Sequence, residues 1–387
     1  LYYLSDASAV VLFVQGNGCP IARNTVPTLD AVRAEYAPQG VRFLMLNANP
    51  QDDRDSIAEE AAAFGIDYPI LVDEAQLVAA SLGVTRTAEA FVISTKTWEI
   101  VYRGPVDDRL DYEAQKVEAS ATYLADALDA TLAGRAPAVA VVASRGCRVK
   151  LPNTRRPAPT YAGSVGAILQ EKCVTCHVPG GIGPFALEDY EDASGWAPMI
   201  REVVRTRRMP PWHADPHVGV FGNDISLSVA ETRAIVLWVE AGAPRGDGPD
   251  PLAEASKEAP EWALGTPDFI IEIDEQELPA TGIIDYRYLE IDAPNDKDVW
   301  VRGVEVLPGN YAANHHVLVS IDYPEGSTPP WDEDSRWLDG VLAAYAPGAE
   351  AQNFPGESAQ FLPAGSKLIV QLHYTTTGRP ETVASRL

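Results

Sequence analysis

The clearest chemistry in the sequence lies in the run Cys173-Val174-Thr175-Cys176-His177. Two cysteines separated by two residues and followed directly by a histidine form the pattern that attaches haem c: the thiols make thioether bonds and the histidine binds the iron. The rival interpretation, half of a zinc site, needs a second pair of ligands at similar spacing. The other two cysteines, Cys19 and Cys147, stand far apart. The sequence therefore predicts one covalent haem c at this run.

Two methionines and a histidine compete for the second axial position on the iron. Met199 lies on the apolar stripe of an expected helix, where a methionine more often packs in the core than binds iron. Met209 stands in the run 207–212, outside any expected helix, where two prolines stiffen the loop. We expect Met209 to bind the iron, with His213 as the fallback. His213 and His217 could instead hold another metal, although such a pair on a proline-flanked loop is more often solvated.

The other three histidines, His315, His316 and His373, lie further along the chain, and their imidazole rings could bind a metal ion. On the strand expected over Lys367–Tyr374, alternation places His373 off the more apolar face. Three imidazoles without a thiolate suit copper or zinc. Neighbours in a regular strand point to opposite faces, so His315 and His316 can share one metal only where the backbone bends, as at a bulge.

Cys19 is a candidate redox thiol. It follows an expected strand and precedes Pro20 and a helix, whose N-terminal dipole lowers a thiol pKa. The fourth position of a C-x-x-C pair is Ala22, so a dithiol within the motif is excluded. Cys147 is the only unclaimed partner. The sequence leaves open whether the two form a structural disulfide or remain free thiols.

Elements alternate between strand and helix around Cys19, which predicts a mostly parallel sheet in an α/β domain over residues 1–145. A linker rich in proline and basic residues is expected over 146–160. The expected elements are strands Ala9–Val14, Val41–Leu46, Phe91–Ser94 and Glu99–Tyr102 and helices Pro27–Tyr36, Ser56–Phe64 and Tyr112–Leu132.

Around the C-x-x-C-H run the apolar spacing becomes helical, which predicts a small all-α haem domain over 161–248. Ser228 and Glu231 have the spacing of a capping box at a helix start. An acidic, proline-rich linker is expected over 249–263. Short β-branched runs then predict an antiparallel β-sandwich over 264–387. The expected strands include Phe269–Ile273, Val299–Val306, Val317–Ile321 and Lys367–Tyr374.

The stretch Phe13–Arg109, with Gly18–Arg23 and Arg86–Phe91, resembles the redoxin and peroxiredoxin-like branch of the thioredoxin superfamily. Members that act on thiols usually have proline where Ala88 stands, and peroxidatic members have threonine where Gly16 stands. Both departures argue against peroxidase and disulfide-reductase activity. Because Ala22 also removes the resolving thiol, we expect no thioredoxin-like reduction of disulfides.

The segment Tyr161–Asp247 resembles the cytochrome c module behind such redoxin domains in large bacterial exported proteins. The matching runs are the C-x-x-C-H run, Gly181–Phe185 and Met209–His213.

The runs Asn314–Val317 and Gln371–Tyr374 resemble the N-terminal sandwich of the copper type II, ascorbate-dependent monooxygenases. The resemblance implies that His315, His316 and His373 hold one electron-storing copper. In that family a second sandwich domain holds the oxygen-activating copper with a His-x-His pair and a methionine. The sequence has no such pair.

Composition limits the classes of partner. The 387 residues carry a formal net charge of −25, which repels nucleic acid and anionic lipid surfaces. No apolar run reaches the roughly 18 residues of a membrane span. The chain begins in a strand without a signal peptide, so we expect a piece of a longer precursor.

Covalent haem attachment implies a periplasmic or otherwise exported protein, with a redox protein or a larger membrane-associated complex as partner. The sequence thus predicts an exported c-type cytochrome that transfers electrons to a copper site, as part of a copper-dependent monooxygenase. The alternative is a non-catalytic electron carrier or scaffold subunit of a larger respiratory or membrane-associated complex.

Overall fold

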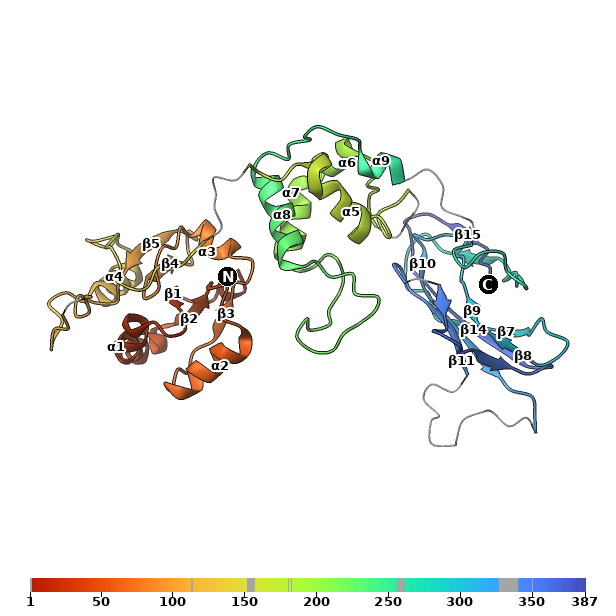
Figure 1. Ribbon diagram of the computed structural model, residues 1–387, viewed down its shortest axis with the longest axis horizontal. Coiled ribbons are helices and arrows are strands. Elements are labelled where there is room, and N and C mark those ends of the chain that lie inside the picture. Colours follow the sequence, from red (N-terminus) through yellow and green to blue (C-terminus); the bar gives the residue numbers. More distant parts are fainter. Residues whose placement is uncertain are drawn as a thin grey trace. The chain divides into compact units, whose positions relative to one another are not determined.

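The computed structural model describes residues 2–112, 114–151, 157–179, 181, 183–255, 262–326, 340–349 and 351–387 (Figure 1). The chain divides into two compact units, Leu1–Pro157 and Ala158–Leu387. The boundary lies inside the expected linker 146–160. Residues 152–156 of that linker, and residues 256–261 of the second one, lie outside the described residues.

A five-stranded sheet in the order β3-β2-β1-β4-β5 forms the centre of the N-terminal unit. β1 pairs in parallel with β2, and β2 with β3, whereas β4 and β5 add antiparallel strands beside β1. Every residue of β1 is buried, as expected for a central strand. The strands are β1 (Ala9–Gln15), β2 (Val41–Asn47), β3 (Ile70–Val72), β4 (Ala90–Ser94) and β5 (Ile100–Gly104).

Helices pack on both faces of this sheet because alternate residues of β1 point to opposite sides. On one face Phe13 shares an apolar cluster with Leu29 of α1 and Leu128 of α4. On the other face Leu12 shares a second cluster with Ala79 of α3. The helices are α1 (Pro20–Tyr36), α2 (Arg54–Ala63), α3 (Leu77–Ser81) and α4 (Tyr123–Leu132), with 3-10 turns at Tyr2–Leu4 and Ala37–Gln39.

The last helix of this unit is shorter than the sequence predicts. The expected helix Tyr112–Leu132 is wrong in its first half, since α4 begins at Tyr123. The Asp108 carboxylate accepts hydrogen bonds from the backbone N–H groups of Ser120 (2.8 Å) and Ala121 (3.1 Å), which hold that stretch in a loop. Helix propensity is a weak preference that such contacts override.

The first part of the C-terminal unit is helical. Trp238 of α8 is fully buried, and its indole N–H donates to the carbonyl of Pro244 at 3.1 Å. The capping box of Ser228 and Glu231 is confirmed at the start of α8. The helices are a π-helical turn at Tyr161–Val165, α5 (Gly166–Lys172), α6 (Tyr190–Gly195), α7 (Ala197–Arg205), α8 (Val229–Glu240) and α9 (Pro251–Ala255).

The rest of this unit is β-rich, and its main sheet is antiparallel in the order β11-β10-β14-β7. One face of that sheet carries the core, which includes Val317, Val319, Val370 and Leu372. The strands are β6 (Gln276–Leu278), β7 (Arg287–Asp292), β8 (Val299–Val301), β9 (Gly303–Val304), β10 (Asn314–Asp322), β11 (Val341–Tyr345), β12 (Gln352–Asn353), β13 (Gln360–Leu362), β14 (Lys367–Tyr374) and β15 (Glu381–Val383).

Two expectations about these strands need correction. Phe269–Ile273 forms no strand. Isolated backbone hydrogen bonds connect it to the last residues, for example from the N–H of Ile271 to the carbonyl of Leu387 at 2.9 Å. Val299–Val306 is divided into β8 and β9. No helix among the described residues is long and apolar enough to cross a bilayer.

Candidate functional site

Cys19 occupies the position that the sequence predicts, at the N-terminal cap of α1 directly after the loop that follows β1. Its side chain is buried, with 2% exposure. The sulfur accepts hydrogen bonds from the Thr87 hydroxyl (3.0 Å) and the Ala22 N–H (3.4 Å). The preceding loop is fixed by Glu60, whose carboxylate accepts the Gly18 N–H at 3.0 Å. The fold thus holds this sulfur in one place.

Cys147 lies beside Cys19, although the two are far apart in the sequence. Thr87 joins them, because its N–H donates to the Cys147 carbonyl (2.8 Å) and its hydroxyl oxygen accepts the Cys147 N–H (2.9 Å). Both cysteines are free thiols. The structure therefore brings together the two cysteines that the sequence leaves as either a disulfide or free thiols.

The two thiols differ in acidity. Burial acts to raise the pKa of Cys19, but hydrogen bonds from Thr87, Ala22 and Cys147 together bring it below that of an ordinary thiol. Burial raises the pKa of Cys147, and the neighbouring Cys19 adds to the effect. Cys19 is therefore the more readily formed thiolate of the pair.

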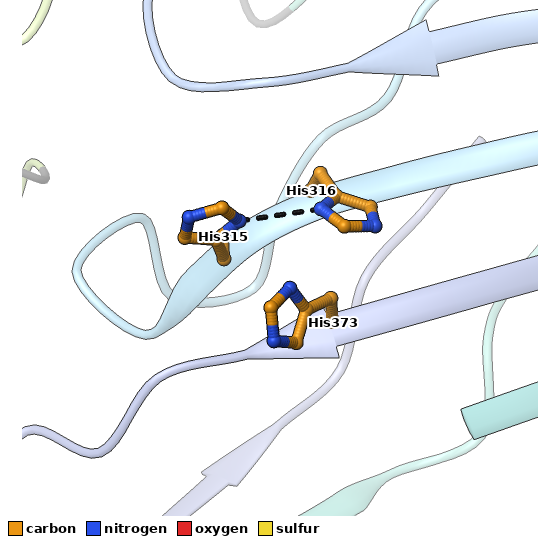
Figure 2. A group of neighbouring side chains, drawn as sticks. All are labelled: His315, His316 and His373. Atoms are coloured by element: carbon orange, nitrogen blue, oxygen red, sulfur yellow. Dashed lines mark hydrogen bonds between the residues drawn. The ribbon is translucent and has the colours of Figure 1, made fainter. Parts of the chain in front are cut away.

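The three C-terminal histidines converge at an irregularity of the sheet. β10 and β14 pair in antiparallel register with Asn314 opposite Tyr374 and His316 opposite His373, so His315 is an extra residue in a β-bulge. Figure 2 shows the rings of His315 and His316 on the same side as His373. One ring nitrogen from each histidine lies within 4.8 Å of the others. The bend that a shared metal requires is present at this residue.

Neighbouring side chains orient these rings. The Oε1 of Gln371 accepts the Nε2–H of His316 at 3.1 Å, and the Gln371 amide donates to the Tyr288 hydroxyl at 2.9 Å. Because Nε2 of His316 carries the proton in this bond, its Nδ1 holds a lone pair. The Tyr286 ring stacks on His373 with 4.4 Å between centroids.

The cluster fits a single small cation. The Nδ1 atoms of His315 and His316 lie 3.2 Å apart. Two nitrogens bound to one ion at about 2.0 Å in tetrahedral geometry would lie roughly 3.3 Å apart. The Nδ1 of His373 is buried and has no hydrogen-bond partner among the described residues, although it points toward the other two rings (Figure 2). Burial and the two neighbouring histidines lower the pKa of His373, which favours the neutral ring that a metal binds.

The C-x-x-C-H run follows α5 directly, with Cys173 as the cap of that helix. The Nδ1–H of His177 donates to the Phe185 carbonyl at 2.9 Å, which leaves Nε2 for another partner. A Cβ at Gly183 would lie 2.7 Å from His177 Nδ1, so glycine permits this close approach. Burial raises the pKa of Cys173 to about 12.

Large apolar side chains remain exposed in the same helical part. Phe185 stacks on Trp196, with 4.2 Å between ring centroids. Met209 lies in the loop between α7 and α8 and is 40% exposed. The exposed apolar residues include Val178, Trp196, Met199, Met209 and Phe221.

The expectation that Met199 lies in the core is wrong, because its side chain is 46% exposed. α7 buries Ala197, Ile200 and Val204 instead, so the buried stripe does not include Met199. His213 and His217 are exposed, and among the described residues they join no group of potential metal ligands.

Residues 1–108 match the model of the AhpC/TSA family. The N-terminal unit contains a thioredoxin-like AhpC/TSA domain. This confirms the predicted redoxin domain.

Three solved structures are similar to parts of the chain. An uncharacterized conserved protein from Geobacillus kaustophilus has 27% identity and a TM-score of 0.36, covering 40% of this chain and 82% of its own. A hypothetical protein from Sinorhizobium meliloti 1021 has 27% identity and a TM-score of 0.35, covering 39% and 84%. A thiol:disulfide interchange protein of the thioredoxin family from Chlorobium tepidum TLS has 17% identity and a TM-score of 0.26, covering 34% and 83%. No curated protein matches.

Within the AhpC/TSA domain, the sequence does not reveal the contact of Thr87 with both cysteines, because a threonine in a loop carries no signal of what it faces. Ala88, which follows it, has a φ of 57°. This left-handed backbone conformation is uncommon for alanine. In the C-terminal unit the missed neighbours are Tyr286 and Tyr288, whose places depend on the pairing of β7 with β14.

Proposed function

We propose that this chain is an exported c-type cytochrome redox protein that passes electrons from one covalent haem c to one copper ion. The observation that carries the proposal is the convergence of His315, His316 and His373 at the bulge of β10, in a chain that also contains a C-x-x-C-H run. A thioredoxin-like domain of redox type precedes both.

The haem would be held by thioether bonds from Cys173 and Cys176, and its iron would be bound by the Nε2 of His177 and by Met209. Bound haem supplies a one-electron carrier. The Phe185 carbonyl fixes the tautomer and ring orientation of His177 through its 2.9 Å hydrogen bond.

The copper would be held by the three histidines through ring nitrogens. Imidazole serves both Cu(I) and Cu(II), which a one-electron store requires. Gln371 fixes the His316 ring, and Tyr286 covers one face of His373. These contacts would keep the three histidines in place when the copper ion changes between Cu(I) and Cu(II), which favours fast electron transfer.

Haem attachment implies the periplasm or an equivalent compartment. The net charge of −25 favours a redox partner with a basic docking face, either a single protein or a larger membrane-associated complex.

Metal analysis of the purified full chain tests the proposal. We expect one iron and one copper per chain, and His373→Ala should keep the iron and lose the copper. His217→Ala serves as the matched control, because it removes an exposed histidine outside the cluster. After copper is removed with a chelator, addition of one equivalent of Cu(II) to the anaerobic, haem-reduced chain should oxidise the haem in the control and at least tenfold more slowly in His373→Ala. Unchanged copper content in His373→Ala would contradict the copper site.

A second candidate is a carrier or scaffold subunit without copper chemistry. One iron and no copper per chain would support this candidate over the first.

A further inference from the structure

The fold itself places Cys147 against Cys19. Residues 147–149 run antiparallel to residues 85–87. The Thr87 N–H donates a hydrogen bond to the Cys147 carbonyl (2.8 Å), and the Val149 N–H donates one to the Thr85 carbonyl (3.1 Å). Val149 is buried in the apolar cluster beneath the sheet. The segment that the sequence assigned to the start of a linker is therefore packed on the domain.

Gly146 allows the close approach of this segment. A Cβ at Gly146 would lie 1.9 Å from the Thr87 carbonyl oxygen, so any other residue would push the strand-like segment away. Together with the backbone hydrogen bonds and the burial of Val149, this fixes the position of Cys147 next to the Cys19 sulfur.

The two sulfurs differ in access. Cys19 is only 2% exposed and receives hydrogen bonds from the Thr87 hydroxyl and the Ala22 N–H. Cys147 is exposed. In thiol–disulfide exchange an outside thiolate attacks the accessible sulfur, and the sulfur best stabilised as a thiolate leaves.

We propose that Cys19 and Cys147 are oxidised to a disulfide by a disulfide oxidant such as oxidised glutathione, which is itself reduced to two thiols, and that the Cys19–Cys147 disulfide accepts two electrons from the dithiol of a partner protein, which attacks the sulfur of Cys147. Neither haem nor copper takes part, so the proposal stands or falls independently of the function proposed above.

The exchange has two steps. A partner thiolate attacks the Cys147 sulfur, a partner–Cys147 disulfide forms, the Cys19–Cys147 bond breaks and Cys19 leaves as a thiolate. The second partner thiolate then attacks the partner's own sulfur in the mixed disulfide and releases Cys147 as a thiolate, which takes up a proton. The partner dithiol has become a disulfide, and two electrons have passed to the cysteine pair.

The direction of transfer agrees with the expectation that this chain does not reduce disulfides as thioredoxin does. Hydrogen bonds to Cys19 lower its pKa and so stabilise the reduced form of the pair. A disulfide whose reduced form is stabilised is an acceptor of electrons.

Equilibration of the full chain with reduced and oxidised glutathione tests the proposal. Acid quenching, thiol blocking and peptide mapping by mass spectrometry distinguish all four cysteines. The peptides of Cys19 and Cys147 should become linked under oxidising conditions and separate again under reducing conditions while the protein stays folded. At intermediate ratios, glutathione attached to Cys147 should exceed glutathione attached to Cys19 at least tenfold.

Gly146→Ala should lower the linked fraction at a fixed glutathione ratio at least threefold. Gly195→Ala should leave it unchanged, since a Cβ there meets nothing within 4 Å. The proposal is overturned by the absence of linked peptides at every ratio, by a link that is reduced only after unfolding, by glutathione chiefly on Cys19, or by an unchanged linked fraction in Gly146→Ala.

Discussion

Each of the two units brings a pair of cysteines together, but by different means. In the N-terminal unit Cys19 and Cys147 meet across Thr87, through hydrogen bonds between distant segments. In the C-terminal unit Cys173 and Cys176 are neighbours on one turn after α5, next to a histidine. The first arrangement suits a bond that forms and breaks, and the second suits permanent attachment. The contrast shows that spacing along the chain identifies only the second kind of site.

The largest expected effect separates the two pairs directly. Replacing both Cys173 and Cys176 by alanine should abolish covalent haem, because each supplies one thioether bond. Cys19→Ala and Cys147→Ala should retain it fully. Haem staining after denaturing electrophoresis measures the result. Covalent haem in the Cys173 and Cys176 double variant would remove the distinction between the pairs.

The next effect concerns Met209, which we propose as the second ligand of the haem iron. Met209→Leu should convert a six-coordinate, low-spin spectrum into one with an open or water-filled position, because leucine has no sulfur to bind iron. Met199→Leu, a change of similar size on a methionine that is also exposed, should leave the spectrum unaltered. Absorbance spectra of the two ferric variants decide the matter, and the reverse pattern would assign the ligand to Met199.

A smaller effect is expected beside the histidine cluster. Gln371→Leu removes the acceptor for the Nε2–H of His316 and should weaken copper binding by about 10- to 100-fold, as for other residues that orient metal ligands. Tyr288→Phe keeps Gln371 and removes only its second contact, so its effect should be smaller. Competition with a chromophoric chelator measures both affinities. Equal affinity in Gln371→Leu and the unchanged chain would show that the bulge alone positions the ring.

The smallest effect concerns Thr87. Thr87→Val removes a hydrogen bond to the Cys19 thiolate, a bond to a charged group worth about 1.5–3 kcal/mol, and should raise the pKa of Cys19. The pKa of Cys19 is lowered in the folded chain. As the pH is raised, alkylation of Cys19 should therefore accelerate at a lower pH in the unchanged chain than in Thr87→Val. Peptide-resolved alkylation with iodoacetamide against pH measures the shift.

Thr87→Ser retains the hydroxyl and is the matched control. An alkylation profile for Thr87→Val that coincides with that of Thr87→Ser would mean that the α1 terminus, through the Ala22 N–H, sets the acidity of Cys19 without help from Thr87.

Regular spacing explains what the sequence could predict. The strands β1 and β2 and the capping box of α8 were predicted from local patterns and are confirmed within one residue at each end. Alternation in β14 correctly put His373 off the core face. The same rule applied to β10 showed that a bend was needed at His315 and His316, which is where the register shifts.

What the sequence could not predict depends on contacts between distant segments. The start of α4 is set by the Asp108 carboxylate, and the exposure of Met199 by which side of α7 meets the rest of the helical part. The contact between Cys147 and Cys19 depends on a short pairing of two loops, which has no periodicity to reveal it.

The distance along the chain between Cys19 and Cys147 has a thermodynamic consequence. A bond between them would enclose most of the unit Leu1–Pro157 in one covalent ring. A ring of well over 100 residues reduces the entropy of the unfolded chain enough to add about 5 kcal/mol to the free energy of unfolding. A partner that reduces the bond would therefore also lower the free energy of unfolding of this unit. The melting temperature of the unit would then report the oxidation state of the cysteine pair.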